Sequence, residues 1–175
     1  LSGTPLNDDV GSNRFTVRVS DDAGLSAQAT LEISVTNVND PPSAAGNSGS
    51  VAENSPSGTP ILQVEASDID ASDSLSYAIT AGNVGNAFAI DSSGNITSNS
   101  SLDYETLNAY TLSISVTDSG GLTDSANVAI SIVDVNEAPG INDVNTTIDA
   151  SLSPGSFVAL MSATDPDAND SLTYA

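Results

Sequence analysis

The chain has 175 residues, with 23 acidic side chains against two basic ones, and its formal net charge is −21. A charge of this sign and size excludes electrostatic binding to nucleic acid and disfavours adsorption to an anionic lipid surface. Because the chain has no Cys and no His, disulfides, the usual zinc sites and imidazole chemistry are excluded as well. Hard cations held by oxygen atoms are the metal class that remains.

Apolar residues alternate with Ser, Thr, Asn and Asp at a period of two, which is typical of half-buried β-strands. Near the start of the chain, Phe15, Val17 and Val19 form one such set, and Leu31, Ile33 and Val35 form the next. Seven more strands are then predicted, separated by turn signals such as Gly120-Gly121. They are residues 49–53, 60–66, 75–80, 87–91, 95–98, 109–117 and 125–134.

Seven short strands in about one hundred residues indicate an immunoglobulin-like antiparallel sandwich. The side chains on the inward faces of these strands are the predicted core. They are Leu62, Val64, Phe88, Ile90, Leu112, Ile114, Val128 and Ile130, together with the ring of Tyr110.

The sequence repeats itself at an offset of 97 residues, as in the pairs Asp21 and Asp118, Asp68 and Asp165, and Asn39 and Asn136. A period of that size corresponds to one small domain, so the chain is predicted to be a tandem array. We expect residues 1–42 to be the C-terminal part of a first repeat, 43–139 a complete second repeat, and 140–175 the N-terminal part of a third. The chain is therefore expected to be a segment of a longer protein.

Acidic motifs follow one another along the second repeat. They are Glu53-Asn54, Asp68-Ile69-Asp70, Leu102-Asp103-Tyr104-Glu105, Val116-Thr117-Asp118 and Asp134-Val135-Asn136-Glu137-Ala138-Pro139. In this order they resemble the motifs of the cadherin repeat, over the full length of the second repeat. The resemblance implies an all-β fold of tandem immunoglobulin-like Greek-key sandwiches with seven strands per repeat. It also implies Ca²⁺ sites between consecutive repeats.

The resemblance assigns Ca²⁺ ligands to both junctions between repeats. Between the second and third repeats they are Glu53, Asp103, Glu105, Asp134, Asn136, Glu137, Asp165 and Asp167. Between the first and second repeats they are Asn37, Asn39, Asp40, Asp68, Asp70 and Asp118.

The chemistry of these residues agrees with the assignment. An Asp-x-Asp pair in a strand places both carboxylates on one side, where they repel each other unless a cation lies between them. Calcium takes six to eight oxygen ligands from carboxylates, carbonyls and water. A merely solvated, salt-adapted acidic surface is the alternative interpretation.

Two departures from the family pattern predict that the junctions differ. Asn37 stands where the family has an Asp, and Asn7 and Asp9 stand roughly where Asp103 and Glu105 do in the second repeat. The junction between the first and second repeats is therefore predicted to hold fewer ions and to bend more readily.

The predicted function is that of a calcium-rigidified extracellular repeat array, an extender or adhesion module of a large secreted or cell-surface protein. The absence of Lys and Cys favours a bacterial calcium-dependent adhesin as the parent. The expected partners are Ca²⁺ and neighbouring repeats, with no nucleic acid and no direct membrane insertion. Alternatives are recognition of carbohydrate or of another copy of the protein, and accessory repeats of a larger secreted enzyme or fibre. No enzyme is expected, since no His, Cys or Lys can activate a nucleophile.

Overall fold

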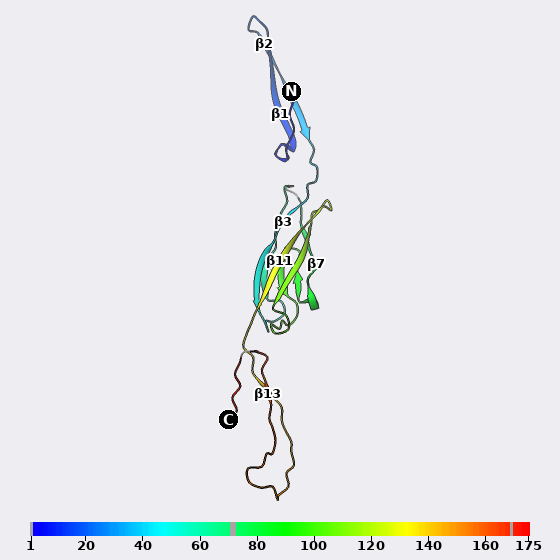
Figure 1. The fold of residues 1–175 in the computed structure, drawn as a ribbon. Helices are drawn as coiled ribbons and strands as arrows, with labels where there is room; N and C mark the ends of the chain where they lie inside the picture. Colours follow the sequence, from blue (N-terminus) through cyan, green and yellow to red (C-terminus); the bar gives the residue numbers. More distant parts are fainter. Residues whose placement is uncertain (1, 71–72, 169) are drawn as a thin grey trace.

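The computed structural model describes residues 2–70, 73–168 and 170–175 (Figure 1). Leu1, with which the predicted first repeat begins, lies outside the described residues. A two-stranded hairpin, a β-sandwich and a C-terminal segment follow one another along one long axis. The described residues outside the strands include two single-turn 3-10 helices, η1 (Asn7–Asp9) and η2 (Val84–Asn86).

The N-terminal hairpin consists of β1 (Gly11–Ser20) and β2 (Ser26–Val35), which pair antiparallel over their full length. Its tight turn is closed by Asp21, whose Oδ1 accepts a hydrogen bond of 2.8 Å from the backbone N–H of Leu25. Phe15 lies opposite Leu31 on the apolar face, as the alternation predicts. These positions recur 97 residues later in the central pair of strands of the sandwich.

The first sheet of the sandwich has the strand order β4-β11-β10-β7. These strands are β4 (Asn47–Ala52), β11 (Thr123–Val133), β10 (Ala109–Thr117) and β7 (Ser76–Ala81). Strand β4 runs parallel to β11, whereas the other pairs are antiparallel. The carboxyl ends of β4 and β11 therefore meet at the same edge of the sheet.

The opposite layer contains a three-stranded sheet in the order β5-β9-β8, formed by β5 (Pro60–Gln63), β9 (Asn95–Ser98) and β8 (Phe88–Ile90). A further pair consists of β3 (Ser43–Ala45) and β6 (Glu65–Ser67). If β3 and β4 are taken as two halves of one interrupted strand, and β5 and β6 likewise, the described residues contain the seven strands predicted for this repeat.

The predicted strand 60–66 is interrupted at Val64, which the alternation alone did not indicate. The N–H of Val64 donates to the carbonyl of Gly94 at 2.9 Å, and the pairing partner then changes from β9 to β3. Strand β3 itself was not predicted. Because its three residues are small and only Ala44 is half-buried, they lack the apolar alternation that identifies the longer strands.

The core lies between the two layers and confirms the predicted register. Val64, Phe88, Leu112, Ile114, Val128 and Ile130 are buried, whereas Leu62 and Ile90 are half-buried and pack against them. The rings of Phe88 and Tyr110 meet edge to face, with centroids 4.9 Å apart and an interplanar angle of 88°. The sandwich is thus an all-β unit with one continuous apolar interior.

The C-terminal segment returns to the sandwich through a short antiparallel pair, β12 (Gly140–Ile141) and β13 (Ala163–Thr164). This pair directly precedes Asp165, and it therefore brings the second Asp-x-Asp sequence to the lower end of the sandwich in Figure 1. In the described part of the chain, no helix has the length and apolar character needed to cross a membrane.

Candidate metal centres

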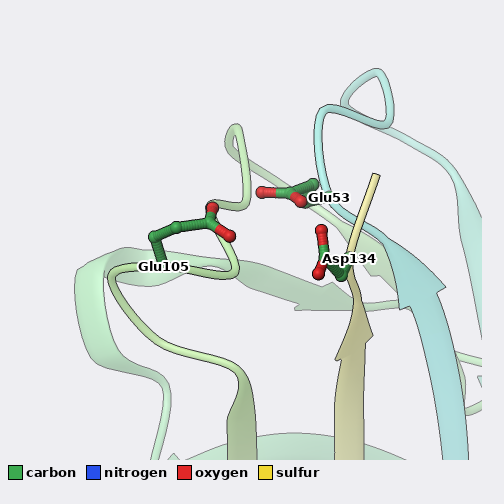
Figure 2. Close-up of side chains that lie close together, drawn as sticks. All are labelled: Glu53, Glu105 and Asp134. Atoms are coloured by element: carbon green, nitrogen blue, oxygen red, sulfur yellow. The ribbon is translucent and has the colours of Figure 1, made fainter. Parts of the chain in front are cut away.

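Three carboxylates converge at the lower end of the sandwich. Glu53, Glu105 and Asp134 each place one oxygen within 4.8 Å of the others, and Figure 2 shows the three side chains facing one another. Glu53 directly follows β4 and Asp134 directly follows β11, so the parallel pairing of these strands sets the two residues side by side. Glu105 comes from the loop between β9 and β10.

Glu53 also holds this end of the sandwich together. It is only 3% exposed, and its Oε2 accepts a hydrogen bond of 2.8 Å from the N–H of Tyr104. Its Oε1 accepts another of 2.8 Å from the N–H of Val135. One buried carboxylate thereby positions both the loop that carries Glu105 and the linker that carries Asp134.

The C-terminal segment adds carboxylates to the same end of the sandwich. Glu105, Glu137 and Asp167 form a second group within 4.8 Å, and Asp165, Asp167 and Asp170 form a third. Asp167 is fixed to the linker, since its Oδ2 accepts a hydrogen bond of 2.9 Å from the N–H of Glu137. Glu105, Asp167 and Asp170 line a cleft of about 630 Å³, together with Asp134 and Asn136.

The carboxylates of this cluster disfavour one another's charge. Partial desolvation raises the pKa of Asp134, and the negative charges of Asp167 and Glu53 raise it further. Burial likewise raises the pKa of Glu105 and of Glu137, again assisted by the charge of Glu53. A bound cation would reverse this balance, because an opposite charge favours the ionised form.

Asp103 is the one predicted ligand of this junction that the structure places differently. Its carboxylate accepts hydrogen bonds from the N–H and the hydroxyl of Thr106, at 2.8 and 2.9 Å. These bonds lower the pKa of Asp103. Within the residues that the structure describes, Asp103 belongs to none of the carboxylate groups, and its role as a ligand stays a prediction.

The upper end of the sandwich carries a second cluster, formed by Asp68, Asp70 and Asp73. Asp70 is 7% exposed and contacts the linker that precedes the sandwich. Its Oδ1 accepts a hydrogen bond of 2.9 Å from the amide of Asn37, and its Oδ2 accepts one of 2.8 Å from the N–H of Asp40.

The other predicted residues of the upper junction lie beside this cluster. The amide of Asn39 donates to Oδ2 of Asp118 at 2.8 Å, and the amide of Asn7 donates to Oδ2 of Asp40 at 2.8 Å. Burial raises the pKa of Asp118, but hydrogen bonds from Asn39 and from backbone N–H groups, including that of Leu122, outweigh burial, so its pKa lies below the ordinary value. The structure thus brings together all six predicted residues of this junction.

Several carboxylate oxygens at both ends lack the partners that buried oxygens normally have. Oδ2 of Asp68, Oδ2 of Asp73 and Oε2 of Glu137 are buried and have no hydrogen-bond partner among the described residues. An unpaired buried charged oxygen is destabilising, and a hard cation would supply the missing interaction. The donors are carboxylate and amide oxygens, the set that Ca²⁺ prefers. The residues at both ends therefore fit a calcium ion.

Two members of these clusters, Asp73 and Asp170, were missed in the sequence. They lie 97 residues apart, each three positions after an Asp-x-Asp pair. The repeat offset could have identified them, but the motif set named above contains no acid at this position.

Comparison with known proteins shows which family this chain is similar to. The model of the family described as "Cadherin domain" matches residues 47–135. The protocadherin-like wing polarity protein stan of Drosophila melanogaster is 38% identical over an alignment of 172 positions that covers 90% of this chain and 5% of that protein. Protocadherin Fat 4 of Mus musculus is 37% identical over an alignment of 171 positions that covers 88% of this chain and 3% of that protein. The chain thus spans only a small part of these relatives.

Solved structures show the same fold. Extracellular cadherin domains 1–5 of protocadherin gamma B2 match with a TM-score of 0.64 and 28% identity, covering 89% of this chain and 32% of that one. Domains EC22–24 of mouse cadherin-23 match with a TM-score of 0.65 and 27% identity, covering 94% of this chain and 56% of that one.

Proposed function

This chain belongs to the cadherin family, and from that premise we propose that it is a calcium-rigidified extracellular array that serves as an extender or adhesion module of a longer cell-surface protein. Cadherin domains bind calcium in general, are extracellular and are adhesion modules rather than enzymes. We propose the repeat boundaries at residues 1–42, 43–139 and 140–175.

One observation supports this function above the others: carboxylates from both sides of a linker meet at the lower end, and a carboxylate of the sandwich holds the preceding linker at the upper end. At the lower end, Asp134 belongs to the sandwich and Asp167 to the segment beyond the linker. At the upper end, Asp70 of the sandwich contacts Asn37 and Asp40 of the preceding linker. A cation bound at the lower end would contact both neighbours and thereby restrict their relative orientation, and a cation bound at the upper end would contact the sandwich beside the linker that Asp70 holds.

The proposed ligands are the residues predicted from the motifs. At the lower junction they are Glu53, Asp103, Glu105, Asp134, Asn136, Glu137, Asp165 and Asp167, and at the upper junction they are Asn37, Asn39, Asp40, Asp68, Asp70 and Asp118. When bound, calcium supplies positive charge to carboxylates that otherwise repel one another. The residues of the chain supply the rigid geometry, chiefly through the hydrogen bonds of Glu53 and Asp70.

The narrower prediction of a bacterial adhesin has no support from the relatives named above, which are animal proteins, and we leave it out of the proposed function. Binding of another copy of the chain fits a family whose ectodomains interact homophilically. No observation favours carbohydrate as a ligand.

Small-angle X-ray scattering of the chain in calcium and in chelator tests the proposed function. In calcium we expect the scattering of an elongated rod, and in chelator we expect a more flexible profile whose mean dimensions are smaller. Addition of NaCl to equal ionic strength is the control, since simple screening would also weaken repulsion between carboxylates. Profiles that do not differ between calcium and chelator would contradict the function.

A further inference from the structure

One stretch of the sandwich carries no charge. Residues 74–90 contain no Asp, Glu, Lys or Arg, although the chain as a whole has a net charge of −21. No other stretch of the sequence is as long without a charged side chain. These residues form β7, η2 and β8. This side of the sandwich therefore contrasts with its two acidic ends.

Both sheets of the sandwich end at this uncharged stretch. Strand β7 is the last strand of the four-stranded sheet, and β8 is the last strand of the three-stranded sheet. Within the residues that the structure describes, β7 pairs only with β10, and its outer backbone edge, on the right-hand side of the sandwich in Figure 1, has no strand partner. Proteins commonly protect such edges with charged side chains or Pro, because an open edge can pair with a strand of another molecule. Residues 74–90 contain neither.

Apolar side chains reach the open edge from the core. Tyr77 and Ile79 pack against the buried core but are themselves only half-buried, and Ala78 between them is exposed on the outer face of the sheet. The pairing with β10 shifts its register between Ile79 and Ala81, so Ser76–Ile79 is the regular part of the edge. A strand added here would cover further apolar area and would provide partners for the outer backbone groups of β7.

We propose that two copies of the chain associate side by side through antiparallel pairing of β7 with β7 of the second copy. Acids elsewhere on the surface make two copies repel each other, so this uncharged edge is where they can approach with the least repulsion. A two-fold axis at Ala78 places Tyr77 opposite Ile79 of the second copy, which is a favourable cross-strand pair of an aromatic and a β-branched residue. The inference goes beyond the proposed function, because it concerns the side of the sandwich rather than its two ends.

Sedimentation equilibrium of the whole chain over a range of concentrations tests the inference. Ala78→Asp is compared with the wild type and with Ala129→Asp. Ala129 is exposed on β11, which has a paired strand on either side, so its replacement adds the same charge to the same sheet away from the edge. The wild type should associate reversibly, and more tightly as NaCl screens the repulsion between copies. Ala78→Asp should weaken dimerisation by about tenfold or more, because it sets two like charges opposite each other, whereas Ala129→Asp should change it little.

Disulfide trapping identifies the surface that pairs. The chain has no Cys, so Ala78→Cys and Ala129→Cys each introduce a single thiol. With the oxidant diamide, Ala78→Cys should form a covalent dimer at concentrations at which Ala129→Cys stays monomeric. Circular dichroism shows whether each variant is folded, and trapping, which adds no charge, provides the test if Ala78→Asp does not fold. A wild type that is monomeric at all concentrations, equal dimerisation of the two folded Asp variants, or equal trapping of the two Cys variants would overturn the inference.

Discussion

Calcium should raise the melting temperature of the sandwich, and replacement of Asp134 should remove much of that increase. Glu53, Glu105 and Asp134 all belong to one sandwich, so an ion bound among them is bound by the folded state and released on unfolding. For extracellular sites with dissociation constants of roughly 0.1–1 mM, calcium at about 10 mM stabilises the folded state by about 1.4–2.7 kcal/mol per site. For a domain of this size the shift corresponds to about 6–20 °C.

The assay is thermal unfolding followed by far-ultraviolet circular dichroism, in chelator and in calcium, at matched ionic strength. In chelator, Asp134→Asn should melt at or above the wild-type temperature, because the change removes a charge that partial desolvation and the neighbouring charges of Asp167 and Glu53 disfavour. In calcium the order should reverse. Glu65→Gln, which removes an exposed acid outside the group formed by Glu53, Glu105 and Asp134, should show the full wild-type response.

Two results would refute this reasoning. One is an equal calcium response in the wild type and in Asp134→Asn, which would mean that Asp134 is not a ligand. The other is an equal increase when NaCl replaces calcium at the same ionic strength, which would mean that screening of the acidic surface explains the whole effect.

Three further predictions concern the core, acid stability and the junctions. Leu112 is fully buried, so Leu112→Ala should lower the free energy of unfolding by about 3–5 kcal/mol in urea titrations. Asp124 accepts a hydrogen bond from the N–H of Ala44, which lowers the pKa of the Asp124 carboxyl from its ordinary value of 3.8. The stabilisation from this carboxylate is therefore present above the ordinary value and is lost as pH falls through the lower pKa of the folded state. In thermal melts at stepwise lower pH, Asp124→Asn should lose less stability than the wild type in this range. Asp134→Ala should loosen the lower junction markedly in calcium, as measured by small-angle scattering, whereas Asn37→Ala should change the upper junction little; the opposite order would contradict the predicted difference between the junctions.

The fold could be predicted from the sequence because its strands carry a strong alternation of apolar and polar residues. Leu112 and Ile114 face the core while Ser113 and Ser115 lie on the other face of the sheet, so the period of two fixes the register of β10. The interruption at Val64 could not be predicted in this way, because it depends on which strand pairs with each half of the segment.

The candidate sites could be predicted from the sequence to a similar degree. The order of the acidic motifs identified most of the residues that meet at the two ends, but it could not show how each side chain is used. Glu53 accepts hydrogen bonds from two backbone N–H groups that the tertiary fold brings to it. Asp103 accepts hydrogen bonds within its own turn, which depends on local geometry. Asp73 was missed because the motif set has no acid at its position, although it lies close to Asp68.

The parallel pairing of β4 with β11 has a mechanical consequence. The chain enters the four-stranded sheet at the amino end of β4 and leaves it at the carboxyl end of β11. These two ends lie at opposite ends of the parallel pair that joins Asn47–Ala52 to Val128–Val133. Tension along the rod would therefore pull the two strands past each other and load the hydrogen bonds between them together, in shear. A hairpin pulled from its open end would instead lose its bonds one after another. The strand pair that places Glu53 beside Asp134 is thus also the pair that would carry a pulling force through the domain.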